Sequence, residues 1–516
     1  MNTLTAKNAG MSWTCFGCMG EMIMITKSKY CEFRQCPKLA WLQKYKPELI
    51  IPDDNVRLRM ENGREVGELA KGLFGEYTDV TVTKDGCPDI PEMIWRTKKE
   101  LERGTPVICE ASFKYDGAYC AVDILKKETG GWAIAEVKSS TENDKEVYYT
   151  DVAYQKYVLE HCGVRVTGCY LITVNSDYVF DGTLNPASFF SITDISDEIE
   201  QEIALVPETL LLAERILSSK EEPVIDLSEG CQKPYPCGFW KYCTRELPEP
   251  SVFDLYRLPF KKKLEYYQRG KVRYEELLTD PSMKNEKRIR QMEYYLRDKG
   301  TYADQKHLQE FLETLSFPLY FLDFETMQPV IPKYIGTRPY QQIPFQYSLH
   351  YIESEGGELK HKEFLAEVGT DPRRALAEQL CKDIPKDVCV TAYNKKFECG
   401  RIRELAEAFP DLSEHLLNIE SNIRDLLDPF QKGWYYNKAM GGSFSIKSVL
   451  PALFPDDPEL DYHSLDGVHN GSEAMTIFPA IENMTPKEQD KARRNLLAYC
   501  KLDTLAMVKV WRKMSQ

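Results

Sequence analysis

The amino-acid sequence predicts a mixed α/β protein, and two stretches support that prediction. Residues 107–138 contain three segments with strand periodicity, separated by Asp116-Gly117 and Gly130-Gly131, which indicates a meander. A helical pattern over 151–160 and a strand pattern over 167–174 follow. From residue 317 strand and helix patterns again follow one another, up to a long helix over 486–513. Elements mixed in this way typically form an α/β core.

Four segments divide the chain. We expect residues 1–24 to be a disordered tail, 25–248 and 316–516 to be two folded domains, and 249–315 to be a helical connector. The first domain begins with a helix over 25–42 and a second around 63–74, and it contains a further acidic helical segment over 194–220. The connector is charged and rich in tyrosine, which is typical of a solvated bridge. In the last domain, strands are expected over 319–324, 345–351, 363–366 and 388–393, and helices over 372–382 and 397–408.

The composition limits the location and partners of the protein. The 516 residues have no apolar run long enough to cross a bilayer and no basic and apolar leader, so we expect a cytoplasmic protein without a membrane partner. The net charge of −14 excludes a surface that is basic throughout, but not a local basic channel. In a reducing compartment, the sixteen cysteines are expected to bind metal or to be buried.

An apolar and aromatic run over 319–324 contains Asp323, and Glu325 follows directly. Residues two apart on a strand point to the same face, so a buried strand would hold both carboxylates together. Carboxylates forced together repel each other, and a divalent cation relieves that repulsion. The pattern fits a metal site, and it also fits a strand-end aspartate beside an exposed glutamate in a turn.

The three strands of the meander contain Glu110, Asp123 and Glu136, and Lys138 shares a face with Glu136. Carboxylates on adjacent strands can hold a divalent cation, and a neighbouring lysine can orient water or stabilise charge at a phosphate. These residues outline a metal-dependent site for phosphodiester cleavage. Taken alone, Glu136-Val-Lys138 favours ordinary surface charges.

The order of these residues resembles the PD-(D/E)XK nuclease superfamily, in particular its RecB-like branch. The chain departs from that family at Gly67, where a histidine ligand is expected, and at Leu159, where a tyrosine is expected. The resemblance implies metal ligands and catalytic residues at positions that match the family motifs. The metal ligands are Glu110, Asp123 and Glu136, and the catalytic residues are Lys138 and Gln155.

The cysteines add to this resemblance. RecB-like nucleases with a four-iron cluster, including the CRISPR adaptation exonuclease, have one cysteine before the nuclease core and three after it. Four thiolates suit a [4Fe-4S] cluster or zinc equally well by number, and the resemblance implies the cluster. Cys31 is an alternative for the early ligand, and the spacing between the first two late cysteines is wider than in that group. The matching residues are Cys36, Cys231, Cys237 and Cys243.

The C-terminal domain resembles the DEDD exonucleases of the ribonuclease H-like (DnaQ-like) fold. Three motifs occur in the family order: Asp323-Phe-Glu325, a segment from Asn394 to Glu398, and Tyr499-x3-Asp503. The last two residues lie one helical turn apart and therefore share a face. Glu398 replaces the aspartate of the family. The resemblance implies that Asp323, Glu325, Glu398 and Asp503 hold two Mg²⁺ or Mn²⁺ ions and that Tyr499 orients the attacking water.

Two further residues near these motifs are candidates for the same site. Asp425 is an alternative fourth acid, and Lys447 is a candidate contact for a phosphate.

Together, the two halves resemble an uncharacterised prokaryotic family that joins a RecB-like, cysteine-bearing nuclease domain to a ribonuclease H-like domain. The resemblance implies a nuclease that acts on DNA in repair or defence, with a PD-(D/E)XK site and a DEDDy site of the 3′-5′ exonuclease type. Two alternatives stay open. One is a nucleic-acid-binding or scaffolding protein with one inactive nuclease fold, which Gly67 and Glu398 favour. The other is an RNA exonuclease.

Overall fold

Two large β-sheets dominate the computed structural model, which describes residues 23–51, 56–142, 146–460 and 462–516. The predicted mixed α/β class is confirmed. The expected tail lies almost wholly outside the described residues, because the description begins at residue 23.

The first sheet has seven strands in the order β2-β5-β6-β7-β8-β9, with β1 paired to β6. The predicted meander is present, because β5, β6 and β7 pair antiparallel, and β7 then pairs parallel with β8. The strands are β1 (Ile25–Thr26), β2 (Thr78–Asp79), β5 (Val107–Tyr115), β6 (Ala118–Glu128), β7 (Gly131–Val137), β8 (Val166–Val174) and β9 (Phe190–Asp194), and β3 (Thr83–Lys84) pairs separately with β4 (Cys87–Pro88).

Helices cover both faces of this sheet. On one face α1 (Lys27–Gln35), α5 (Glu146–His161) and α7 (Glu200–Ser218) enclose a core that includes Tyr30 and Tyr154, and α3 (Val56–Lys71) contributes to a core on the other face. The helix expected over 25–42 is two helices, because Cys36 is extended and Pro37 begins α2 (Pro37–Tyr45). The other helices of this part are η1 (Pro47–Leu49), α4 (Ile90–Arg103), α6 (Pro186–Phe189), η2 (Glu229–Cys231) and α8 (Trp240–Cys243).

The second sheet has five strands in the order β13-β12-β11-β14-β15. Its central strand β11 pairs antiparallel with β12 and parallel with β14, and the register shifts directly after Glu325. The long helix α19 packs on β11 and β12. The strands are β11 (Leu319–Met327), β12 (Ile343–Ile352), β13 (Lys360–Leu365), β14 (Cys389–Ala392) and β15 (Ile423–Asp425). The helices are α13 (Pro372–Asp383), α14 (Lys396–Ala408), α15 (Ser413–Ser421), α16 (Asp428–Gln431), η4 (Lys438–Met440), α17 (Ile446–Leu453), η5 (Pro458–Leu460), η6 (Tyr462–Ser464), α18 (Gly471–Ala480), η7 (Ile481–Asn483) and α19 (Pro486–Met514).

The connector differs from the expected solvated bridge because it has an apolar core of its own. Val252, Leu255, Tyr274, Leu277 and Met292 are buried against one another. The short strand β10 (Thr301–Ala303) pairs with β16 (Tyr435–Asn437) of the C-terminal part. The connector helices are η3 (Val252–Asp254), α9 (Phe260–Gln268), α10 (Tyr274–Leu278), α11 (Glu286–Leu296) and α12 (Gln305–Leu312).

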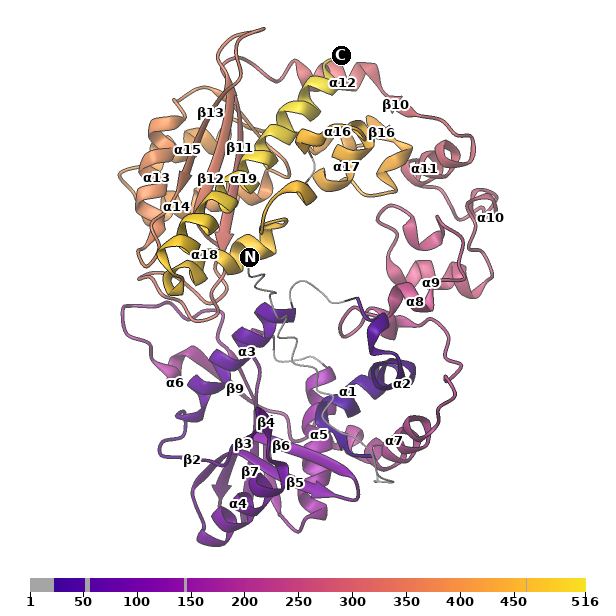
Figure 1. Cartoon of the computed structure of the whole chain (residues 1–516), viewed down its shortest axis with the longest axis vertical. Helices are drawn as coiled ribbons and strands as arrows, with labels where there is room; N and C mark the ends of the chain where they lie inside the picture. The colour runs from indigo at the N-terminus through magenta and orange to yellow at the C-terminus, as the bar shows by residue number, and fades with distance from the viewer. Residues whose placement is uncertain (1–22, 52–55, 143–145, 461) are drawn as a thin grey trace, which may run out of the picture.

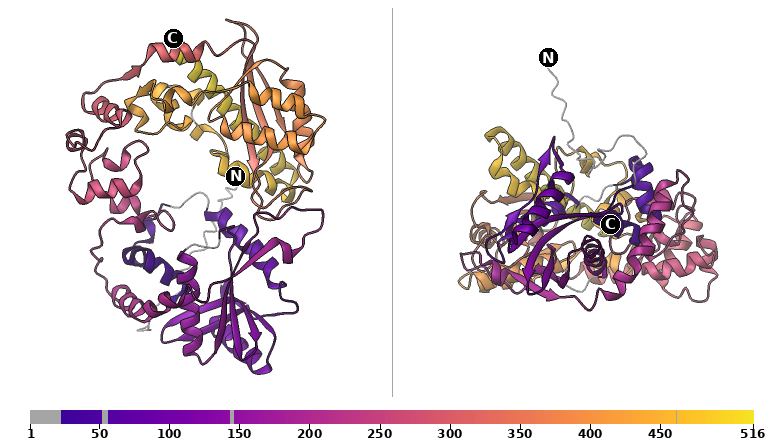
Figure 2. Two further views of the ribbon diagram at one scale, coloured as in Figure 1. Left: turned by 180° about the vertical axis from the view of Figure 1, so that it is seen from behind. Right: turned by 90° about the horizontal axis from the view of Figure 1, so that it is seen from below.

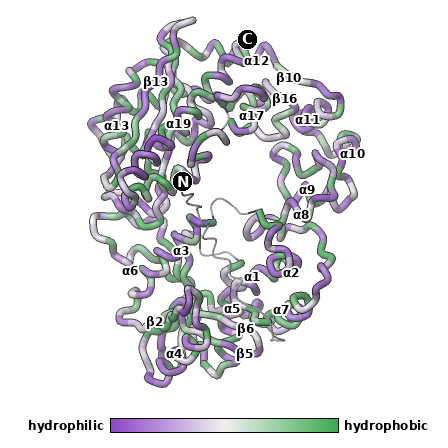
Figure 3. The backbone as a smooth tube through the Cα atoms, in the orientation of Figure 1, coloured by the Kyte–Doolittle hydropathy of each residue, from purple (hydrophilic) through white to green (hydrophobic). Residues whose placement is uncertain are grey.

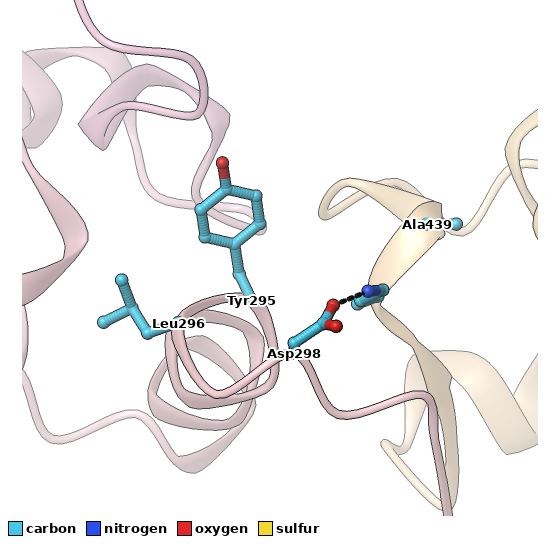
Figure 4. A pocket seen from close by; sticks show the side chains of 5 residues that line it. Tyr295, Leu296, Asp298 and Ala439 are labelled. Atoms are coloured by element: carbon cyan, nitrogen blue, oxygen red, sulfur yellow. Dashed lines mark hydrogen bonds and ion pairs between the residues drawn. The ribbon is translucent and has the colours of Figure 1, made fainter.

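A hollow lies where the connector meets the C-terminal part. Its volume is about 460 Å³, and Asp298 forms an ion pair with Lys438 at its edge (Figure 4). Tyr295, Leu296 and Ala439 complete the lining, so none of the predicted site residues borders this hollow.

The elements follow a ring-like path, with the seven-stranded sheet at one end, the five-stranded sheet at the other and the connector along one side (Figures 1 and 2). The loop over 328–342, between β11 and β12, closes the opposite side. Its residue Val330 is fully buried in the core formed with α3. Phe180 exchanges backbone hydrogen bonds with Gly336 and Thr337, of 2.8 and 3.0 Å. These two contacts of the loop therefore join the C-terminal part of the chain to the N-terminal part.

None of the described helices is long and apolar enough to cross a membrane. Hydrophilic residues interrupt the hydrophobic ones along the helices labelled in Figure 3.

Candidate functional site

The meander places its three predicted carboxylates on neighbouring strands, although their oxygen atoms do not all lie within 4.8 Å of one another. Residue pairs on either side of Glu110 and Asp123 place these two opposite each other on β5 and β6. Glu136, near the end of β7, is only 1% exposed. Asp123 accepts a hydrogen bond of 2.8 Å from the backbone N–H of Val137, which links it to the strand of Glu136. We name the first cluster by its members: Lys27, Glu110, Asp123, Glu136, Lys138, Asp151 and Gln155.

Two lysines neutralise much of this cluster. Lys138 Nζ lies 2.6 Å from Glu136 Oε1 and 2.6 Å from Asp151 Oδ2. Lys27 Nζ lies 2.9 Å from Glu136 Oε1 and 3.8 Å from Asp123 Oδ1. The amide of Gln155 donates to Glu136 Oε2 at 2.7 Å, while its own buried oxygen has no hydrogen-bond partner. The predicted residues Lys138 and Gln155 thus lie with the predicted metal ligands.

Sequence reasoning missed Lys27 and Asp151. Asp151 lies four residues before Gln155 on α5, and residues at that spacing share a helix face, so this signal was present in the sequence. No comparable signal pointed to Lys27, which reaches the cluster from α1, 109 residues before Glu136.

The pKa values of the three predicted carboxyls shift in different directions: those of Glu110 and Asp123 are raised, and that of Glu136 is lowered. Burial, and then the charge of Asp123, raise the pKa of Glu110 to about 7. Burial, and then the charge of Glu136, raise the pKa of Asp123 to about 6. Burial also acts to raise the pKa of Glu136, but the charges of Lys138 and Lys27 outweigh it and hold that pKa well below its ordinary value. Glu110 has a φ of 58°, a strained backbone conformation of the kind that clusters at functional sites.

Gly67 and Leu159, the two positions where the sequence departs from the RecB-like pattern, have different surroundings. Gly67 lies on α3, where an added Cβ would meet no atom within 4 Å. Leu159 is buried in the core on the α5 face of the sheet. Tyr154, five residues earlier on α5, donates a hydrogen bond of 2.5 Å to the carbonyl of Ile25, two residues before Lys27.

Residues far apart in the sequence meet at the second cluster, which consists of Asp323, Glu325, Glu398, Cys500 and Asp503. Strand β11 presents the first two, α14 the third, and α19 the last two. Asp323, Glu325 and Cys500 offer ligand atoms within 4.8 Å of one another, and they are the only such group of three among the described residues. Glu398 is 2% exposed, and its buried oxygen Oε2 has no hydrogen-bond partner.

The second cluster lacks the lysine pairing of the first. None of its four carboxylates forms an ion pair within 4.0 Å in the part of the chain that the structure describes. Burial raises the pKa of all four: well above the ordinary value for Asp323, Glu325 and Glu398, and to about 6 for Asp503. Neighbouring carboxylates raise the first three further. This geometry fits hard divalent cations, which take carboxylate oxygens as ligands.

Two tyrosines and a lysine border these acids. Tyr462 donates a hydrogen bond of 2.6 Å to Asp503 Oδ1, and Tyr499 is a second hydrogen-bond partner of that carboxylate. Lys447 Nζ lies 5.5 Å from the ring centre of Tyr462 and 5.7 Å from that of Tyr499, and its charge acts on Glu325 and Asp503. Tyr462 was not predicted, because no motif contains it.

Asp425, the alternative fourth acid of the second cluster, binds backbone N–H groups. Its carboxylate accepts hydrogen bonds from the backbone N–H groups of Asn394, Lys395 and Leu427, at 2.9, 3.2 and 3.0 Å. It thereby fixes the turn before α14, the helix of Glu398. The structure assigns Asp425 a supporting position.

The four predicted cysteines line one small cavity, of about 20 Å³, which we name the cysteine site. Cys36 joins α1 to α2, and the other three come from the segment around η2 and α8. Cys31 does not border this cavity and packs on the core of the first sheet. All four cysteines are among the described residues, and no three of their sulfur atoms all lie within 4.8 Å of one another. A tetrahedral zinc site would hold them about 3.8 Å apart.

Comparisons with known proteins leave the activity open. Residues 320–445 match the family model described as "Domain of unknown function (DUF2779)". An uncharacterised protein, UU173 of Ureaplasma parvum serovar 3, is 27% identical over 220 residues, which span 39% of this chain and 31% of that protein. A solved structure described as "Crystal structure of SSO0001" is 11% identical and covers 45% of this chain and 90% of its own, with a TM-score of 0.23. A TM-score this low does not establish a shared fold.

Proposed function

We propose that the protein is a metal-dependent nuclease that hydrolyses phosphodiester bonds of nucleic acid, DNA in preference to RNA. The observation that supports it best is the second cluster, where three buried carboxylates and the half-buried Asp323 meet without an ion pair in the described structure. Burying unpaired charges is costly, so such a cluster is maintained for a purpose. With Tyr499 bound to Asp503, it resembles a DEDDy exonuclease site in which Glu398 takes the place of an aspartate, and we propose a ribonuclease H-like fold for this domain on that ground.

In this proposal Asp323, Glu325, Glu398 and Asp503 hold two divalent ions, Mg²⁺ or Mn²⁺. When bound, such ions supply the charge that activates water and stabilises the leaving oxygen. Tyr499, held against Asp503, orients the attacking water. Lys447 places its positive charge at the edge of the cluster, where it would attract a phosphate. Half-buried Tyr462 fixes the Asp503 carboxylate by a hydrogen bond of 2.6 Å.

The first cluster would be a second hydrolytic site, of the PD-(D/E)XK type. Glu110, Asp123 and Glu136 would hold the divalent ion. Lys138, 2.6 Å from Glu136, would place a positive charge beside the reacting phosphate. The buried, unpaired oxygen of Gln155 leaves one acceptor available in this site. We propose a PD-(D/E)XK fold for this domain on the same grounds.

For the cysteine site we propose an iron–sulfur cluster in preference to zinc. The support is that four cysteines line one cavity while no three of their sulfur atoms all lie within 4.8 Å of one another, whereas a single tetrahedral zinc ion would hold them about 3.8 Å apart. The site joins α1 to the segment at the far end of the same domain, which suits a structural role.

A second function has a specific observation in its favour. Because Lys27 and Lys138 already pair with Glu136 and Asp151, the charges of these two acids are balanced without a metal ion. A protein in which this fold only binds nucleic acid, while the second cluster cleaves, would show the same pairing.

Labelled single- and double-stranded DNA and RNA, incubated with Mg²⁺ or Mn²⁺, test the proposal. We expect wild-type protein to degrade DNA and EDTA to stop it. Asp323→Ala should abolish cleavage by the second cluster and Lys138→Ala cleavage by the first. Asp411→Asn, at an exposed ion pair with Arg374, is the control. A pure, folded protein without any metal-dependent degradation would refute the proposal, and loss in only one of the two variants would identify a single active site.

A further inference from the structure

The ammonium group of Lys27 lies among the carboxylates of the first cluster. Its nitrogen is 2.9 and 3.1 Å from the two oxygens of Glu136, 3.6 Å from Asp151 Oδ1 and 3.8 Å from Asp123 Oδ1. Asp123 and Glu136 are the two acids that adjacent strands β6 and β7 present side by side. The lysine therefore occupies the position between the oxygens that a divalent ion would need.

The backbone holds Lys27 in this place. It is the first residue of α1, which begins directly after β1. Strand β1 pairs with β6, Thr26 caps the helix, and the hydroxyl of Tyr154 holds the carbonyl of Ile25. At the other end of the same helix, Cys36 enters the cysteine site. Both ends of α1 are thus attached, and the reach of the side chain is set by the fold.

A lysine for structural neutralisation alone is already present. Lys138 contacts Glu136 and Asp151 at 2.6 Å, so Lys27 is a second cation on the same acids. The second cluster offers the contrast, because its described carboxylates have no lysine within 4.0 Å. Two cations held by the same oxygens repel strongly, so binding of a divalent ion must displace the ammonium.

We propose that Lys27 competes with the divalent ion for Asp123 and Glu136 and thereby sets the metal affinity of the first cluster. This inference rests on the proposed function, because it assumes that the first cluster binds a metal. It makes Lys27 a positioning and affinity-setting residue of that site. It also predicts that the two clusters load at different metal concentrations, the second before the first.

The test is Mn²⁺ binding to the full-length chain, followed by the electron paramagnetic resonance signal of free Mn²⁺. Asp323→Asn and Asp503→Asn are introduced first to remove binding at the second cluster. In that background we expect Lys27→Met to bind Mn²⁺ at least about tenfold more tightly, since it removes one charged hydrogen-bond partner. Lys27→Arg should stay near the unmodified affinity. The control is Lys29→Met, an exposed lysine on the same helix.

A second measurement needs no change at Lys27. The protein is treated with an acetylating reagent, and the labelled lysines are identified by mass spectrometry. Acetylation of Lys27 should increase when Mn²⁺ is added, because the displaced ammonium becomes accessible, and acetylation of Lys29 should stay constant. This measurement applies if Lys27→Met does not fold.

The outcomes separate the two proposals. One outcome is that Asp123→Asn removes tight Mn²⁺ binding while Lys27→Met leaves that binding unchanged or weakens it, and Mn²⁺ does not expose Lys27. In that case the first cluster binds metal as proposed, but Lys27 does not compete with the ion. If the background protein binds no Mn²⁺ that depends on Asp123, the proposed function of the first cluster fails, and this inference fails with it.

Discussion

Glu136 and Glu398 are both buried glutamates, with 1% and 2% of their surface exposed, yet their surroundings shift their pKa values in opposite directions. Two lysines stabilise the charged form of Glu136. Burial and the charge of Asp323 destabilise the charged form of Glu398. Glu398 therefore contributes a buried carboxyl to the second cluster, and its unpaired oxygen is available to a ligand.

Glu398→Gln should stabilise the metal-free protein, because it removes a buried charge that has no partner. With EDTA at pH 8, we expect the melting temperature to rise, by about 2–4 °C for each kcal/mol gained. The stabilisation that Mn²⁺ brings should shrink in the same variant. Glu407→Gln, at an exposed position on α14, is the control. A lower melting temperature of the metal-free variant would contradict this account.

The first cluster predicts a dependence of stability on pH. Folding raises the pKa of Glu110 from 4.5 to about 7 and that of Asp123 from 3.8 to about 6, so the folded state binds more protons than the unfolded chain in this range. The contribution of these groups is most favourable below the unfolded values and declines as the pH rises to about 7. A metal ion needs the deprotonated forms, so the shift in melting temperature on adding Mn²⁺ should grow between pH 5.5 and 8. Thermal melts with EDTA or Mn²⁺ across that range provide the measurement, and a shift independent of pH would argue against metal binding by these carboxyls.

At the level of single elements, α1 joins two sites. Its first residue contributes the ammonium of Lys27 to the first cluster, and Cys36 at its end lines the cysteine site. Strand β11 has a comparable position in the second half, where Asp323 and Glu325 precede the loop over 328–342 that packs against the first sheet.

Cys36→Ser should remove the metal content of the cysteine site, whereas Cys31→Ser should leave it intact. The reason is that only Cys36 borders the cavity with Cys231, Cys237 and Cys243. Iron and zinc analysis with the visible absorption spectrum distinguishes an iron–sulfur cluster from zinc and measures the loss. Because a bound metal stabilises the folded state, Cys36→Ser should also lower the melting temperature. Equal metal content in both variants would show that the cavity does not hold the metal.

At the level of the whole molecule, two junctions attach the part that contains the first sheet to the rest of the ring. On the connector side, Trp240 next to the cysteine site packs edge-on against Phe253 and Phe260. On the other side, Tyr340 donates a hydrogen bond to the carbonyl of Ser139, the residue that follows Lys138. The loop that closes the ring therefore contacts the residue next to Lys138 of the first cluster.

Val330→Asp should open the ring at this loop, because it places an unpaired charge in an apolar core. Small-angle scattering should show a larger radius of gyration, and calorimetry should separate the melting of the two sheets. Ile335→Asp, at a position that is 68% exposed in the same loop, should change neither. Unchanged scattering in Val330→Asp would mean that the connector alone maintains the arrangement.

The sequence by itself determined the local structure and most of the candidate residues. Strand and helix periodicity located β5, β6, β7 and α19, because side-chain alternation and helical spacing are properties of the local backbone. Motif spacing placed Asp323 with Glu325, and Tyr499 with Asp503, since such pairs are neighbours on one strand or one helix. The connector was expected without a core, because its apolar residues are spread among many charges and meet only after folding.

Only the tertiary structure decided which distant side chains meet. Lys27 and Glu136 are separated by 109 residues, and Tyr462 meets Asp503 across 41. Neither contact follows from a local pattern, because each depends on how helices pack on a sheet. The same holds for the choice of Cys36 over Cys31 and for the docking of Val330. The physical reason is that periodicity specifies the face on which a residue lies, whereas packing across the whole core specifies its partner.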